Sequence, residues 1–203
     1  MAKYTKYLIF LIMLLKTTIA MAEPSSDMCG GYGRVSAGVN RTQAKCFEER
    51  LMGASINYTE LFVFDFPITI QSGLDFSYTA SHFIQRVDGT NVECANRLFT
   101  TSIPFNVGYT IGDLSVYMYP YVGLNFSFNN LAKKYENGKE SINYIVDKGA
   151  KRFQPELNVG YDLNIMSFGV GYRFSMDLND FITSENSIKW NHRIEIFHIF
   201  NGD

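Results

Sequence analysis

The fold is indicated most clearly by residues Asp113–Asn129, which read DLSVYMYPYVGLNFSFN. Even positions from Leu114 to Phe128 are apolar, while the odd positions carry Ser, Tyr, Gly and Asn. Residues Phe153–Ile165 alternate in the same way, with the apolar residues at odd positions. Successive side chains leave opposite faces of a pleated strand, so strict alternation predicts β-strands. Both segments exceed the five or six or so residues usual in soluble domains and reach the roughly 9–11 that cross a bilayer.

Alternating segments recur along the chain, and their connections alternate in length. The connections after the second, fourth and sixth segments are short, whereas the other four, Arg41–Arg50, Ile84–Arg97, Asn130–Arg152 and Asp180–Ser187, are long and polar. This sorting is typical of outer-membrane barrels, which have tight periplasmic turns and longer external loops. We therefore predict an all-β fold, an eight-stranded antiparallel up-and-down transmembrane β-barrel. The expected strands are approximately 31–40, 53–64, 66–82, 99–111, 113–129, 153–165, 168–181 and 188–200.

The first 22 residues have the pattern of a secretory signal peptide. Lys3 and Lys6 precede an apolar run over residues 8–15, and Ala20-Met21-Ala22 forms a small-residue cleavage site. The apolar run is shorter than the roughly 20 residues of a spanning helix. We expect cleavage after Ala22 and one outer-membrane barrel domain over residues 23–203, with a short periplasmic segment at 23–30.

Composition agrees with a narrow barrel. The chain is 15% aromatic and 19% charged, and its mean hydropathy of −0.06 averages an apolar lipid face with a polar interior. The net charge of −2 argues against nucleic-acid binding. We expect a monomer in contact with outer-membrane lipid, with no cofactor.

The three cysteines allow a disulfide, because export leads to an oxidising compartment. Cys46 and Cys94 fall in loops at the same side of the predicted barrel, so a Cys46–Cys94 bridge is expected, with Cys29 left over or paired elsewhere. No cysteines are closely spaced and no histidine lies beside one, so no metal site is expected.

The polar faces carry titratable groups of both signs. We expect a network that fills the lumen and pairs its own charges, in preference to a pore or a ligand site, because an unpaired buried charge is costly and about eight strands leave little room. Three lumen tyrosines, Tyr117, Tyr119 and Tyr121, are expected to bond to these charges. The titratable residues are Arg34, Asp75, Glu156, Asp162, Arg173, Asp177, Lys189, Arg193 and Glu195.

Two other classes of protein share parts of this pattern. A lipid-modifying barrel enzyme would need a histidine near a serine and an acid, but the parity of His82, His192 and His198 directs all three outward, so no catalytic residue is expected. A soluble lipocalin-like barrel would instead enclose an apolar ligand site. For residues 130–152 we expect a mobile, solvated loop. The alternative is that the turn signal Asn137-Gly138 closes a protruding hairpin, whose free edges could bind a protein or surface ligand by strand addition.

Three strand motifs carry a resemblance to a known family. Ile103–Tyr109 (IPFNVGY), Tyr119–Leu124 (YPYVGL) and Phe168–Phe174 (FGVGYRF) resemble strands of the PorT-like outer-membrane β-barrel proteins of Bacteroidetes. The resemblance implies a non-enzymatic barrel with a structural or surface-binding role, and some relatives are linked to protein secretion. One departure is the end of the chain, where Phe200 is followed by Asn201–Asp203 in place of a terminal aromatic residue.

Overall fold

The computed structural model describes residues 29–64, 68–112, 115–182 and 187–201, so the expected signal peptide lies outside the described residues. Strands account for most of the described chain. They are β1 (Gly30–Gln43), β2 (Leu51–Val63), β3 (Ile68–Val87), β4 (Thr90–Tyr109), β5 (Ile111–Gly112), β6 (Val116–Glu136), β7 (Lys139–Asn143), β8 (Phe153–Ile165), β9 (Phe168–Asp177) and β10 (Trp190–Asn201), with one short helix, α2 (Tyr144–Asp147). Among the described residues, no helix is long and apolar enough to span a membrane.

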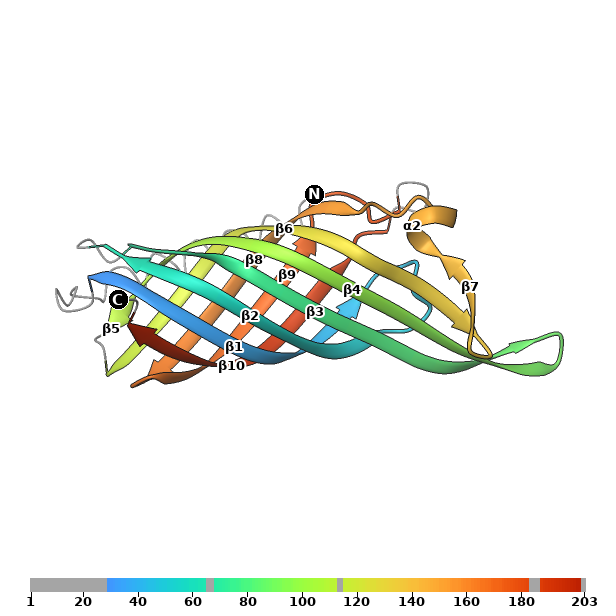
Figure 1. Cartoon of the computed structure of the whole chain (residues 1–203), viewed down its shortest axis with the longest axis horizontal. Coiled ribbons are helices and arrows are strands. Elements are labelled where there is room, and N and C mark those ends of the chain that lie inside the picture. Colours follow the sequence, from blue (N-terminus) through green and yellow to red (C-terminus); the bar gives the residue numbers. More distant parts are fainter. Residues whose placement is uncertain (1–28, 65–67, 113–114, 183–186, 202–203) are drawn as a thin grey trace, which may run out of the picture.

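Eight long strands form a closed antiparallel ring (Figure 1). Neighbouring strands follow the order β4-β3-β2-β1-β10-β9-β8-β6, and an additional β4–β6 ladder closes the ring. The first and last strands meet through twelve register pairs from Tyr32↔Asn201 to Gln43↔Trp190. Closure leaves no sheet edge within the ring, as a strand-built membrane protein requires. The predicted all-β transmembrane barrel is confirmed.

The alternation seen in the sequence separates an apolar outside from a polar inside. Along β8 the even residues from Gln154 to Asn164 are buried, and the odd residues lie outward. The outward faces form a belt of exposed aliphatic and aromatic side chains, including Ile56 at 62% and Ile196 at 67% exposure. An apolar belt of this extent is compatible with lipid and would be a severe aggregation hazard in water. A lipocalin-like barrel has the reverse arrangement.

The two ends of the barrel differ. At one end, here called the turn end, short connections join β2 to β3, β4 to β6 and β8 to β9, and β10 finishes there (Figure 1). At the other, the loop end, lie the longer β1–β2, β6–β8 and β9–β10 connections and the tip of the β3–β4 hairpin. The sorting of connections predicted from the sequence is therefore present, with one exception.

The exception is the connection between β3 and β4, where the long polar loop expected at 84–97 is wrong. The two strands continue outward in register from Ser81↔Asn96 to Val87↔Thr90 and turn over Asp88-Gly89. Asp88 has φ of 49° and Gly89 of 79°, as the two-residue turn of a tight hairpin requires. The charged residues of this segment suggested a loop, whereas they belong to a solvated hairpin.

The solvated loop expected at 130–152 is wrong for its first half, where the alternative, a protruding hairpin at Asn137-Gly138, is present and joins β6 to the short strand β7. Before it, the β4–β6 ladder shifts register between Phe99 and Thr100, leaving Asn130 as an extra residue in β6. A bulge of this kind reverses which face each later residue occupies. Asn129 is buried before the shift and Ala132 after it, so inward positions change from odd to even.

Candidate functional site

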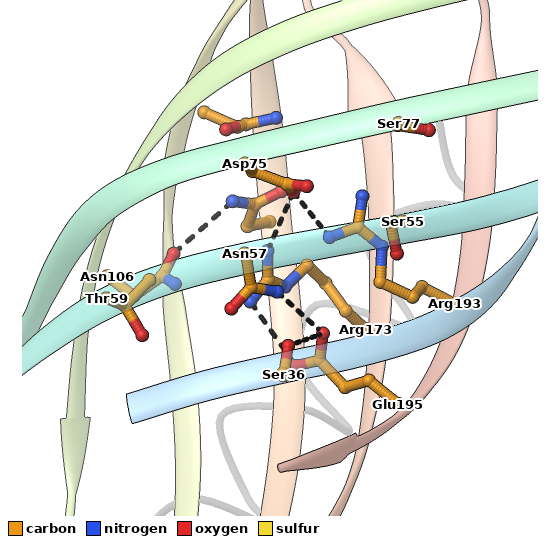
Figure 2. Close-up of polar contacts among 12 residues, drawn as sticks. Ser36, Ser55, Asn57, Thr59, Asp75, Ser77, Asn106, Arg173, Arg193 and Glu195 are labelled. Atoms are coloured by element: carbon orange, nitrogen blue, oxygen red, sulfur yellow. Dashed lines mark hydrogen bonds and ion pairs between the residues drawn. The ribbon is translucent and has the colours of Figure 1, made fainter. Parts of the chain in front are cut away.

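The middle of the lumen is occupied by a charged cluster around Glu195 (Figure 2). Arg34 Nη2 lies 2.5 Å from Glu195 Oε1 and 3.2 Å from Asp162 Oδ2. The other carboxylate oxygen of Glu195 accepts hydrogen bonds from Ser36 Oγ at 3.1 Å and Asn57 Nδ2 at 3.0 Å. The Glu195 carboxylate is therefore held from both sides by partners on β1 and β2.

Asp75 on β3 binds the two remaining arginines from across the barrel. Arg193 Nη1 contacts Asp75 Oδ2, and Arg173 Nη1 lies 3.4 Å from the same oxygen. Arg173 Nε also donates to the hydroxyl of Tyr121 at 3.2 Å, as expected for a lumen tyrosine bonding to the charged residues. Three arginines thus face the three carboxylates of Asp75, Asp162 and Glu195, so this cluster is charge-balanced.

A second cluster lies closer to the loop end. Lys189 Nζ lies 2.9 Å from Glu156 Oε1 and 3.7 Å from Asp177 Oδ1. Asn125 donates to Glu156 at 3.0 Å, and Gln154 donates to Asp177 at 2.9 Å. Every predicted lumen residue is at most 5% exposed and lies in one of these two clusters.

A polar cavity of about 30 Å³ separates the two clusters, with Asp75, Arg173 and Arg193 on one side and Glu156 and Lys189 on the other. This volume accommodates one or two water molecules and no organic substrate. Waters there would bond to Asp75 Oδ1 and Asn125 Oδ1, which have no hydrogen-bond partner among the described residues. The arrangement suits a hydrated structural network.

Aromatic and aliphatic side chains close the lumen at the turn end. Tyr119 and Tyr121 stack with ring centroids 5.1 Å apart and pack with Tyr117, Leu61 and Val63. Tyr119 donates its hydroxyl to the backbone carbonyl of Thr69 at 3.3 Å, so its bond goes to the backbone and not to a lumen charge. The Tyr121 ring also covers Gly160, where a Cβ would come within 2.2 Å of the ring.

The loop end is closed by a small hydrophobic core. It joins the β1–β2 connection to α2 and to the segments before β8 and after β9, which meet in a bridge between Ala150 and Ile182. Phe47 packs edge-on against Tyr144 at 5.3 Å and lies 5.8 Å from Phe181. Apolar and aromatic side chains therefore occupy both ends of the lumen, with the two charged clusters between them. The core residues are Ala44, Phe47, Leu51, Leu98, Ala132, Tyr144, Ala150, Phe181 and Ile182.

The predicted Cys46–Cys94 disulfide is not formed. Cys94 is a buried free thiol on the inward face of β4, and its Sγ lies 3.7 Å from Oε1 of Gln85 on the paired strand. Its part of β4 continues beyond the apolar belt, where burial raises the pKa of the thiol. The expectation places Cys94 in a loop, whereas Cys94 lies in the β3–β4 ladder opposite Phe83, and the paired strand fixes the direction of its side chain.

The histidines lie on the outward face, as their parity predicts. His82 pairs with Glu93 at 2.6 Å, where both side chains are exposed. His192 packs between Phe174 and Trp190, and His198 lies 4.7 Å from the ring of Phe168. Among the described residues, no cluster of three metal-ligating groups occurs. His192 and His198 thus make aromatic contacts on the outward face, whereas His82 lies in the projecting hairpin and pairs with Glu93.

Four strands continue past the rest of the loop end as a projecting sheet, made of β3 Ser81–Val87, β4 Thr90–Arg97, β6 Ala132–Glu136 and β7 (Figure 1). Among the described residues, β2 pairs with β3 only as far as Ala80, so one edge of Ser81–Val87 has no neighbouring strand. Ile84 on this edge is 69% exposed. Unpaired edges are sites at which another strand can add.

Two interior features were not foreseen from the sequence. Lys134 is buried and bonds to Glu48 at 3.1 Å and Gln85 at 3.2 Å, but only the bulge at Asn130 turns it inward. Burial alone would lower the pKa of Lys134, and its hydrogen bonds to Glu48 and Glu136 instead raise it. Phe197 is the second feature: it has inward parity, and the Arg34 guanidinium lies 4.2 Å from its ring centroid. The position of Phe197 in the alternation of β10 is the sequence signal from which its place in the lumen could have been predicted.

Comparison with known proteins supports the fold and no closer relationship. No protein-family model matches the chain, and no curated protein matches it. Neisserial surface protein A is similar, with 13% identity and a TM-score of 0.53, covering 84% of this chain and 97% of that one. The attachment invasion locus protein Ail of Yersinia pestis, solved with the heparin analogue sucrose octasulfate, has 13% identity and a TM-score of 0.48, covering 84% of this chain and 99% of Ail. At these identities the likeness concerns the fold.

Proposed function

We propose that the chain is an integral outer-membrane protein without enzymatic activity, which anchors the projecting sheet at the cell surface for binding. The single observation that carries this proposal is the ring of eight strands with exposed aliphatic residues outside and paired buried charges inside. A barrel built this way is stable only in a membrane. The proposal covers residues 23–203 as one domain that follows a signal peptide cleaved after Ala22.

The orientation follows from the connections. Outer-membrane barrels have short turns on the periplasmic side, so the loop end and its projecting sheet would face outward. The sheet offers Arg86, Ile84 and the free edge of β3 to a protein or surface ligand. Its base is fixed by the buried core at the loop end, so a partner would meet a preformed surface.

Trypsin treatment of intact expressing cells tests this function. We expect cleavage after Arg86 or Lys139, since both are exposed on the projecting sheet, while the barrel stays protected in the membrane. A variant in which both are glutamine should lose the fragments cut at these two positions, while cleavage at the exposed Lys45, Arg50, Lys148 and Arg152 of the loop end remains. Complete protection of the wild-type chain in intact cells, with cleavage after the outer membrane is permeabilised, would place the sheet inside and refute the proposal.

A lipid-modifying enzyme is the alternative, and lipid analysis distinguishes it. The outward histidines make no catalytic constellation, so His82→Ala and His192→Ala should leave the lipid A of expressing cells unchanged. A change in acylation that depends on expression and is lost in either variant would favour the enzyme.

The PorT-like resemblance adds a role in protein secretion to the proposal. Its support is the three strand motifs, of which Tyr121 and Arg173 lie in the lumen and bond to each other at 3.2 Å. Loss of exported proteins from the medium of a deletion strain would agree with this role, and normal secretion would remove it.

A further inference from the structure

Charge on the outward surface is distributed unequally between the two ends of the apolar belt. Arg41, Arg97 and Lys133 lie on outward faces at the loop end, level with one another in the strand pairing through Met52 and Ala80. At the turn end, Glu60 is the charged outward residue among those described. Lys133 pairs with Glu140 at 2.6 Å, and the Arg97 guanidinium lies 4.6 Å from the Tyr135 ring centroid. Of these three cations, Arg41 is the one with no ion pair or ring contact among the described residues.

One part of this boundary combines a cation with an aromatic cluster. Arg41 is exposed and lies directly opposite His192 across the β1–β10 ladder. The His192 ring centroid lies 5.4 Å from that of Trp190 and 5.1 Å from that of Phe174, and its Nδ1 is 2.6 Å from the Tyr172 hydroxyl. We call these five residues, Arg41, Tyr172, Phe174, Trp190 and His192, the rim patch.

Arg41 makes no ion pair among the described residues, although Arg34, Arg173 and Arg193 in the lumen are all paired with carboxylates. Directly below it the outward residues are apolar, with Val39 on its own strand. The guanidinium is thus held at the height where lipid chains give way to headgroups.

His192 can supply a second donor beside Arg41. When the Tyr172 hydroxyl donates to Nδ1, the ring carries its proton on Nε2 and presents an N–H. A guanidinium has the planar geometry that binds phosphate oxygens, and Trp and Tyr rings favour the interface beneath headgroups. Along β10, Trp190 lies one step nearer the loop end than His192, whereas Phe174 on β9 is level with His192. Tyr172 lies below His192, toward the apolar belt, so the two donors are surrounded by rings at the border of the belt.

We propose that the rim patch binds the anionic phosphate headgroup of an outer-leaflet lipid, with Arg41 and His192 as donors to the phosphate. Phe174, level with His192, and Tyr172 below it then pack against the first part of the acyl chains, while Trp190 lies on the headgroup side of the two donors. This inference rests on the proposed outer-membrane location. A lipid is the occupant because the patch continues the belt without a break and opens sideways, along the lipid-facing surface, and not toward the lumen or the solvent-filled loops.

Trp190 provides a direct measurement, since it is the chain's one tryptophan and belongs to the patch. The folded protein is placed in phosphatidylcholine vesicles containing either brominated phosphatidylglycerol or brominated phosphatidylcholine, and quenching of Trp190 gives the relative affinity of the two lipids. We expect phosphatidylglycerol to be preferred about tenfold, the size of one charge-assisted hydrogen bond. Arg41→Gln should abolish most of this preference.

Arg86→Gln is the matched control, because it removes an equally exposed arginine from the tip of the projecting hairpin, away from the belt. In this variant, quenching of Trp190 by each brominated lipid should equal that in the wild type. Millimolar inorganic phosphate should not reduce the preference of the wild type for phosphatidylglycerol. Equal quenching by the two lipids, an unaffected Arg41→Gln variant, or loss of the preference in Arg86→Gln would each overturn the inference. So would competition by inorganic phosphate, which would point to a soluble anion. Unboiled gel migration is measured on every sample, so failure to form the barrel would count against the proposed function instead.

Discussion

Replacing Glu195 with glutamine tests whether the cluster around Glu195 is a charge-balanced network buried from bulk water. Glu195 lies 2.5 Å from Arg34 and 3.5 Å from Arg173, and both arginines are at most 3% exposed. The single amide oxygen can still accept from Ser36 and Asn57, but the amide nitrogen then faces Arg34 in place of an acceptor, and three arginines face two carboxylates. Removing one partner of a buried ion pair costs about 3–5 kcal/mol, and the retained hydrogen bonds favour the lower end.

A loss of about 3 kcal/mol corresponds to a change of roughly 100-fold in the folding equilibrium. It is measured by urea unfolding in phospholipid vesicles, with unboiled gel migration and Trp190 fluorescence as independent readouts. The matched control, Glu93→Gln, removes an exposed carboxylate that pairs with His82 at 2.6 Å and should leave the midpoint almost unchanged.

The double variant Arg34→Gln/Glu195→Gln restores the balance, with two arginines and the two carboxylates of Asp75 and Asp162. It should therefore be more stable than Glu195→Gln alone, which a double-mutant cycle would record as a strong coupling. A Glu195→Gln midpoint that equals that of Glu93→Gln, or a double variant whose loss is the sum of the two single losses, would refute a buried cluster of paired charges around Glu195.

Three further predictions address other parts of the molecule. Phe200→Ala uncovers Gly33, where a Cβ would come within 2.3 Å of the Phe200 ring, so it should destabilise the β1–β10 seam by about 1 kcal/mol in the same unfolding assay; an unchanged midpoint would contradict a sealing role. Gly89→Val puts a branched side chain at φ of 79°, so trypsin should cut at Arg86 faster than in the wild type, and equal rates would contradict the tight turn. Because burial raises the pKa of Cys94, its thiol stays protonated at neutral pH, and maleimide labelling should be slow there and accelerate only as the pH rises; fast labelling at pH 7 would contradict its burial.

The alternation of side chains was sufficient to predict the ring and the lumen residues. In a strand of uniform parity, the face of one residue fixes the face of all others, so Glu156 and Asp162 follow directly from their neighbours in β8. Closure then brings distant strands together, and the pairing of Arg34 with Glu195 follows from the meeting of β1 and β10.

The sequence did not predict features that depend on a break in alternation or on contacts between loops. The bulge at Asn130 reverses the parity of β6 and turns Lys134 inward, and nothing in the local pattern marks it. The core around Phe47 and Phe181 joins segments separated by more than a hundred residues, whose spacing carries no period. The disulfide predicted for Cys94 is wrong because Asp88-Gly89 is the turn of a long hairpin, which places Cys94 in a paired strand and not in a loop.

The central claim is that these eight strands form a closed barrel in the outer membrane. Fractionation of expressing cells, followed by gel migration of the outer-membrane fraction in SDS with and without boiling, tests it most directly. The structure predicts recovery in the outer membrane and a different mobility before boiling, because a ring with no free edge resists detergent. A chain found in the aqueous fraction, or one whose mobility does not change on boiling, would contradict a closed transmembrane barrel.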